Sequence, residues 1–79
     1  MKFTVEIGKF RDPQDGSPCT VEMYLDRESL VDYMHELQKL KNPGDHFHLM
    51  TPSWGMDGLS EKKVISENDL VHHLKVTLR

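Results

Sequence analysis

The chain has 79 residues, of which 10 are Lys or Arg and 13 are Asp or Glu, so its formal charge is −3 at pH 7. This length predicts one domain, residues 1–79, and the mildly acidic balance excludes the clustered basic surface of most nucleic-acid-binding proteins. No apolar run approaches the roughly 18–20 residues that cross a membrane, and the first residues lack the apolar stretch of a signal peptide. One cysteine, Cys19, excludes an internal disulfide. We therefore expect a cytoplasmic protein without a nucleic-acid or membrane partner.

Two stretches near the N-terminus alternate apolar and polar residues with the period of a half-buried strand. The first runs from Phe3 to Phe10 and the second from Cys19 to Leu25. Residues 11–18, which lie between them, hold two Pro, one Gly and two Asp, a composition typical of a loop. The pattern predicts an antiparallel hairpin.

A helix is predicted from Arg27 to Lys41. Asp26 is a suitable N-cap, and the Asn-Pro-Gly sequence at residues 42–44 ends the helical pattern. Five apolar residues recur at helical spacing and predict the side that faces a sheet; they are Leu30, Tyr33, Met34, Leu37 and Leu40. The opposite side carries Glu28, Asp32 and Glu36, a stripe that indicates either a solvated surface or contact with a cationic partner.

Two further alternating stretches run from His46 to Thr51 and from Leu70 to Leu78, and we expect them to pair. The 18 residues between them, 52–69, form a long connection of the kind that often carries function. The predicted fold class is α+β, a four-stranded mainly antiparallel sheet with one helix on one face (ββαββ). Because the core of such a short chain is small, we also expect a homodimer at high concentration.

Catalytic and metal sites have little support in the sequence. His46 and His48 share one side of a strand, and His72 or His73 would bring a third imidazole near if the last strand pairs there, but the spacing matches no recognised zinc motif. Cys19 falls on the apolar side of its strand, and no G-x-S-x-G sequence is present. We predict no enzyme activity, no cofactor and no metal.

The sequence H-L-M-T-P-S-W-G from His48 to Gly55 is the most distinctive feature of the chain, with His-Leu-Lys-Val at residues 73–76 as a second one. Together they resemble a family of small bacterial immunity proteins of polymorphic toxin systems. This chain departs from that pattern at Met56, where a second glycine would be expected. The resemblance implies a non-enzymatic α+β inhibitor that binds one cognate protein toxin, often a nuclease.

The same segment has the residue types of a binding surface. Trp54 and Met56 would supply an apolar contact, and Asp57 and Glu61 an acidic rim. The predicted partner-binding residues are His48, Pro52, Trp54, Gly55, Met56, Asp57 and Glu61. Two alternatives remain for the function, a homodimeric adaptor that pairs through a sheet edge and a metal-binding regulator built on the histidines. Trp54 has an alternative structural role as well, in which its ring fills one end of the core.

Overall fold

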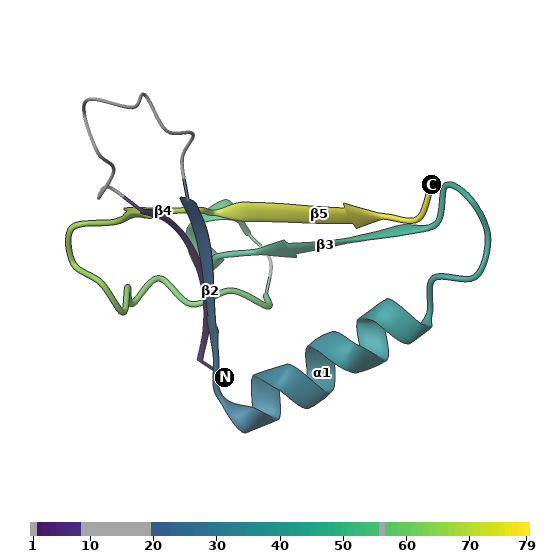
Figure 1. The fold of residues 1–79 in the computed structure, drawn as a ribbon, viewed down its shortest axis with the longest axis horizontal. Helices are drawn as coiled ribbons and strands as arrows, with labels where there is room; N and C mark the ends of the chain where they lie inside the picture. The colour runs from purple at the N-terminus through teal and green to yellow at the C-terminus, as the bar shows by residue number, and fades with distance from the viewer. Residues whose placement is uncertain (1, 9–19, 56) are drawn as a thin grey trace.

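The computed structural model describes residues 2–8, 20–55 and 57–79 (Figure 1). One α-helix, one short 3₁₀ helix and five strands form in this part of the chain, and the fold is α+β. No helix among these residues is long and apolar enough to cross a membrane. The elements are β1 (Phe3–Gly8), β2 (Thr20–Leu25), α1 (Arg27–Gln38), β3 (His46–Met50), η1 (Pro52–Trp54), β4 (Asp69–Leu70) and β5 (His73–Thr77).

The first sheet contains β2, β1 and β4, in that order. β1 and β2 are antiparallel with Phe3 opposite Leu25 and Val5 opposite Met23, so the predicted hairpin is confirmed. Apolar side chains of both strands therefore share one face of this sheet, and Thr4 and Glu6 lie on the other. The predicted ends of the two strands at residues 9–10 and at Cys19 lie outside the described residues.

The second sheet contains only β3 and β5, which are antiparallel as predicted, with Leu49 opposite Leu74. The predicted single strand from Leu70 to Leu78 is wrong, because the chain changes sheets within it. The Val71 N–H donates to the Val5 carbonyl, 2.8 Å away, whereas the His72 carbonyl accepts from the Thr51 N–H at 3.0 Å. The single four-stranded sheet and the ββαββ arrangement are consequently not confirmed.

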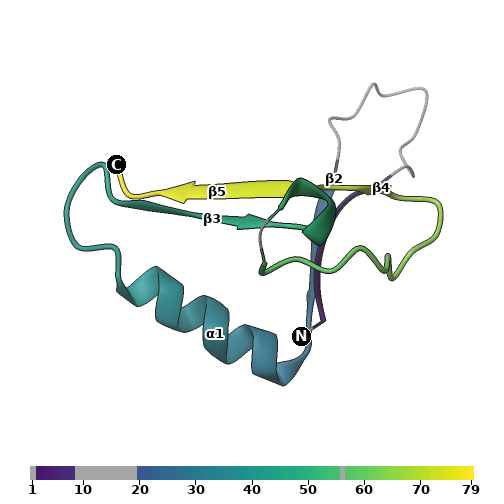
Figure 2. The same cartoon turned by 180° about the vertical axis from the view of Figure 1, so that it is seen from behind.

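The two sheets and the helix form three sides of an open triangle (Figures 1 and 2). Phe3, Val5 and Leu59 are buried in the space they enclose, and Tyr33, Leu49 and Leu74 are among the partly buried residues around them. The radius of gyration is 14.0 Å, whereas about 11.6 Å is typical of a compact domain of this length. The open shape leaves much of the apolar side-chain surface in contact with water.

Helix α1 begins as predicted, with the Asp26 carboxylate accepting from the Ser29 N–H at 2.8 Å. Tyr33 faces the core, where its ring centroid lies 5.3 Å from that of Phe3. The prediction is wrong for Leu30, Met34 and Leu37, which are exposed, whereas Leu40 is half-buried just beyond the end of α1. α1 runs diagonally from the end of β2 toward the loop that leads into β3 instead of lying flat on a sheet, so only a narrow stripe of the helix contacts the core (Figure 1). Glu36, which the sequence pattern placed on the opposite, polar side, is half-buried and pairs with Lys39 at 3.1 Å.

Glu6 is fully buried and holds the long connection against the polar face of the first sheet. Its carboxylate accepts from Thr4 Oγ1 at 2.7 Å, from the Val64 N–H at 2.8 Å and from Asn68 Nδ2 at 3.0 Å. Burial on its own raises the pKa of Glu6, but these hydrogen bonds outweigh it, and the pKa falls below its usual 4.5. Glu6, a charged residue between apolar neighbours in β1, therefore contributes to the interior of the fold.

Candidate binding site around Trp54

The residues after β3 form a tight turn that we call the Trp54 turn (residues 51–55). Pro52 opens the short helix η1, where its fixed φ angle suits the first position. Gly55 closes the turn with φ of 88°, a value that side-chain-bearing residues rarely adopt, and its N–H donates to the Pro52 carbonyl at 2.9 Å. The proline and the glycine of the distinctive sequence therefore shape the backbone.

Thr51 fixes this turn to the start of β5. It is fully buried, and its N–H donates to the His72 carbonyl at 3.0 Å. A second hydrogen bond, of 2.6 Å, joins Thr51 Oγ1 and His72 Nδ1. Two bonds to one residue restrict both the position of the turn and the orientation of the His72 ring.

Trp54 projects from the turn into solvent and is 59% exposed. The alternative in which Trp54 fills the core is therefore wrong. Its ring stacks on that of His72, with centroids 6.1 Å apart and an interplanar angle of 16°, and its centroid lies 6.3 Å from that of His73. Trp54 is thus exposed to solvent but already held in place by its neighbours. A side chain ordered in this way loses little conformational entropy when it binds a partner.

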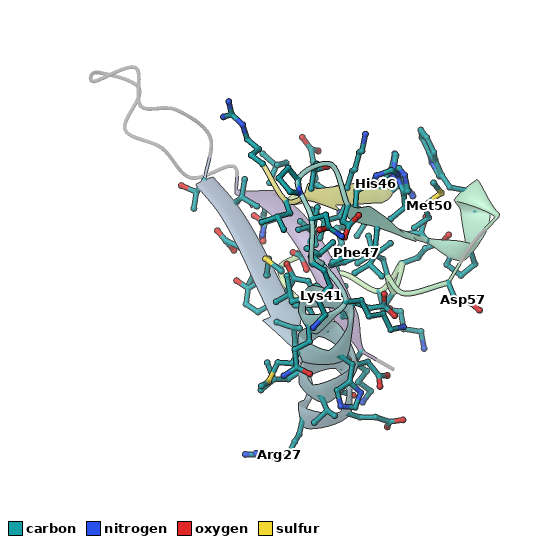
Figure 3. The ribbon with its side chains drawn as sticks, turned by 90° about the vertical axis from the view of Figure 1, so that its right-hand side faces the viewer. Arg27, Lys41, His46, Phe47, Met50 and Asp57 are labelled. Atoms are coloured by element: carbon teal, nitrogen blue, oxygen red, sulfur yellow. The ribbon has the colours of Figure 1, made fainter. Side chains whose placement is uncertain are left out.

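Histidines extend the Trp54 surface along the outer face of β3 and β5. His48 Nδ1 and His73 Nε2 are 2.7 Å apart, and the rings of His46 and His48 meet edge to face with centroids 5.2 Å apart. Desolvation lowers the pKa of His48, and the nearby His73, His46 and Lys75 lower it further. Figure 3 shows His46 and Met50 at one side of this sheet, away from α1.

Two of the histidines lie within hydrogen-bonding distance of each other. The structure confirms the expected approach of His73 to His48, but no group of three potential ligands able to hold a metal converges in the described part of the chain. The distance of 2.7 Å between the two ring nitrogens is that of a hydrogen bond, in which one imidazole donates an N–H and the nitrogen of the other accepts it.

Two other predicted binding residues lie close to the turn. The Glu61 carboxylate accepts from the Ser53 N–H at 2.7 Å, and its hydrogen bonds to Ser53 lower its pKa, so Glu61 supports η1 instead of forming a free rim. Asp57 is exposed, and its carbonyl accepts from the Met50 N–H at 3.3 Å. Met56 lies outside the described residues.

A cleft of about 730 Å³ between α1 and the segment after η1 was not predicted from the sequence. Phe3, Tyr33 and Leu49 supply apolar wall, and Asp32, Glu36 and Asp57 add carboxylates. Two of these carboxylates belong to the acidic stripe of the helix, which was the signal available in the sequence. Because the cleft also contains Lys39 and Lys41, its charge is mixed.

Comparisons with known proteins give no relative for this chain. No family model, no curated protein and no solved structure matches it. The resemblance to immunity proteins therefore depends on the sequence from His48 to Gly55 and on residues 73–76. In the structure these two segments lie side by side, because β3 pairs with β5.

Proposed function

We propose that this chain is a non-enzymatic immunity protein that binds and neutralises a cognate protein toxin through the surface around Trp54. The observation that carries the proposal is the state of Trp54, which is 59% exposed and stacked on a histidine that Thr51 holds. Tryptophan is enriched among residues that dominate binding energy, and a side chain ordered in advance loses less entropy on binding. The resemblance of residues 48–55 to immunity proteins supports the same function.

The charge of the chain fits a basic partner. The net charge is −3, and Asp57 is exposed just beyond the Trp54 turn. A toxin that cleaves nucleic acid carries a basic surface for phosphate groups, and complementary charge raises the rate of association. The proposal places the protein in the cytoplasm, where such a toxin would act on the producing cell.

Protection of cells tests this function. A candidate toxin domain from the genes next to this one is expressed in a host together with the wild-type chain, with Trp54→Ala or with Val64→Ala, and survival is counted. Val64 is the matched control because it is also exposed, at 56%, but lies in the connection that crosses the first sheet. We expect Trp54→Ala to weaken binding by roughly 1–4 kcal/mol and to reduce protection.

Circular dichroism of the purified variants separates loss of binding from loss of folding. Full protection by a folded Trp54→Ala variant would assign binding to another surface. Absence of protection by the wild-type chain against the adjacent toxin would remove the immunity function itself.

A further inference from the structure

An apolar flank of α1 is exposed to solvent. Ser29, Tyr33 and Glu36 form the stripe nearest the core, and the residue that follows each of them is apolar: Leu30, Met34 and Leu37. One residue is about 100° of rotation around a helix, so these three side chains share one flank. They are 43%, 48% and 40% exposed.

This flank faces the β2 side of the molecule. The other flank, which carries Asp32 and His35, lines the cleft beside Asp57 and Gly58. Figure 3 shows α1 between Asp57 on one side and β2 on the other. Leu30, Met34 and Leu37 consequently continue the apolar side of β2, where Val21 is 60% exposed and Met23 38% exposed. We call these five residues the β2–α1 face.

The backbone of β2 offers hydrogen bonds along the same edge. The carbonyls of Phe3 and Val5 accept from the N–H groups of Ser60 and Val71, so these two β1 residues point their backbone groups away from β2. The backbone N–H and C=O groups of their partners Leu25 and Met23 therefore point away from β1. Those of Val21 point the same way, because the direction alternates along the strand. In the described part of the chain, β2 is paired only with β1.

We propose that the β2–α1 face binds a second copy of this chain through antiparallel pairing of the two β2 strands about a twofold axis at Met23. This register places Met23 opposite Met23 and Val21 opposite Leu25, so all three residues exchange backbone hydrogen bonds and their side chains stay on the apolar face. The apolar flanks of the two helices then cover the joined strands on that face.

Charge selects this register over its neighbours. An axis at Glu22 would place two carboxylates directly opposite each other, and an axis at Tyr24 would place Glu22 opposite Asp26. Both arrangements are unfavourable, whereas the axis at Met23 places Glu22 opposite Tyr24 of the second copy. Glu22 already accepts a hydrogen bond from Tyr24 within one chain, at 2.6 Å, so this pair of groups is compatible.

The exposed area of the chain is sufficient for such an interface. The solvent-accessible surface is 5787 Å², about 900 Å² more than the roughly 4900 Å² typical of a compact monomer of this mass. A stable interface buries about 800 Å² on each partner. A dimer through the β2–α1 face would therefore bring the chain close to the exposure of an ordinary folded protein.

Analytical ultracentrifugation of the full chain, from micromolar to millimolar concentration, tests the proposal with charge variants of Met23. We expect Met23→Lys and Met23→Glu each to weaken dimerisation roughly tenfold or more, because two like charges would oppose each other at the axis. A mixture of the two variants should form a heterodimer. Met34→Lys, on the helix flank, should also weaken dimerisation, and Val64→Lys, an exposed apolar position elsewhere, should not.

A wild-type chain that stays monomeric at all concentrations would overturn the proposal, as would an unchanged dimer of folded Met23→Lys and Met34→Lys variants. Circular dichroism confirms folding of each variant. The result is independent of the immunity function, because Trp54→Ala leaves the β2–α1 face intact and should dimerise like the wild-type chain.

Discussion

Two segments of this chain are held by buried polar side chains, but one packs against a sheet and the other exposes an aromatic side chain to solvent. The later part of the long connection, residues 59–68, is held across a sheet face by the buried Glu6 carboxylate. The Trp54 turn is held by the equally buried Thr51, but it presents an aromatic side chain to solvent. In a chain with a small apolar core, polar contacts therefore do two different things. Around Glu6 they complete the fold, and around Thr51 they order a surface for a partner.

The largest effect on stability is expected from Glu6→Ala. The change leaves the Val64 N–H, the Thr4 hydroxyl and the Asn68 amide without their buried acceptor, and the expected loss is roughly 3–5 kcal/mol of unfolding free energy. Urea denaturation measures it, and Glu67→Ala, an exposed position in the same connection, is the control. Equal stability of the two variants would show that the connection does not depend on Glu6.

The same carboxylate predicts the acid limit of stability. Because the pKa of Glu6 is lowered in the folded chain, its stabilisation is complete above its usual value of 4.5 and is lost as the pH falls through the lowered value. Melting temperatures of the wild-type chain should fall over this range, and those of Glu6→Gln should fall less. Parallel curves for the two proteins would contradict the assigned role.

Gly58→Ala is expected to cost less than the loss of Glu6. Gly58 has φ of 118°, and a Cβ atom there would lie 2.7 Å from Leu49 Cδ2. Gly44→Ala is a matched control, because Gly44 has φ of 97° but no atom within 4 Å of its Cβ position. Backbone strain of about 1–2 kcal/mol applies to both, and overpacking adds about 1–3 kcal/mol at Gly58 alone. Equal losses of thermal stability in Gly58→Ala and Gly44→Ala would show that the contact with Leu49 contributes nothing.

Thr51→Val tests whether the hydrogen bond that holds the Trp54 turn contributes to binding as well as to folding. It keeps the shape of the side chain but removes the hydroxyl that is bonded to His72, at an expected cost of about 1–2 kcal/mol of stability. Binding of the toxin domain, measured by calorimetry, should weaken as well, because the turn and the His72 ring below Trp54 lose a fixed contact. Thr77→Val, on the exposed side of β5, should change neither quantity. Lower stability with unchanged affinity for the toxin domain would show that Thr51 stabilises the fold but does not contribute to binding.

The smallest effect is expected from His48. Its pKa is lowered in the folded chain, so protonation favours unfolding, and stability declines as the pH drops below its usual 6.5. His48→Gln should flatten this part of the pH curve. An unchanged curve for His48→Gln would show that the imidazole surface has no influence on folding.

Local patterns in the sequence predicted the elements better than their assembly. The hairpin of β1 and β2, the cap at Asp26 and the pairing of β3 with β5 all depend on alternation or on neighbouring residues, and all three are confirmed. The change of sheet at Val71 was missed because alternation shows which way side chains point and not which strand lies beside them. The inward side of α1 was wrong for a related reason, since its apolar residues predict burial but not the angle at which the helix meets the sheets.

The candidate site was predicted in part. Trp54 was selected from its residue type and is exposed, but the contacts that support it, from Thr51 and His72, join residues 21 positions apart. The role of Glu6 depends on residues 58–62 positions away, and the alternation of its strand shows only that Glu6 lies on the polar side. Contacts between distant segments have no signature in a single sequence unless a motif marks both partners.

The most direct test of the central claim uses the one tryptophan of the chain as a reporter. The wild-type protein is labelled with fluorotryptophan, mixed with the unlabelled toxin domain against which it protects cells, and followed by fluorine NMR while gel filtration confirms the complex. If Trp54 lies at the centre of the interface, its resonance should shift as the complex forms, and solvent should lose access to the ring. A complex that forms while the resonance and its solvent access stay unchanged would contradict the claim that Trp54 binds the toxin.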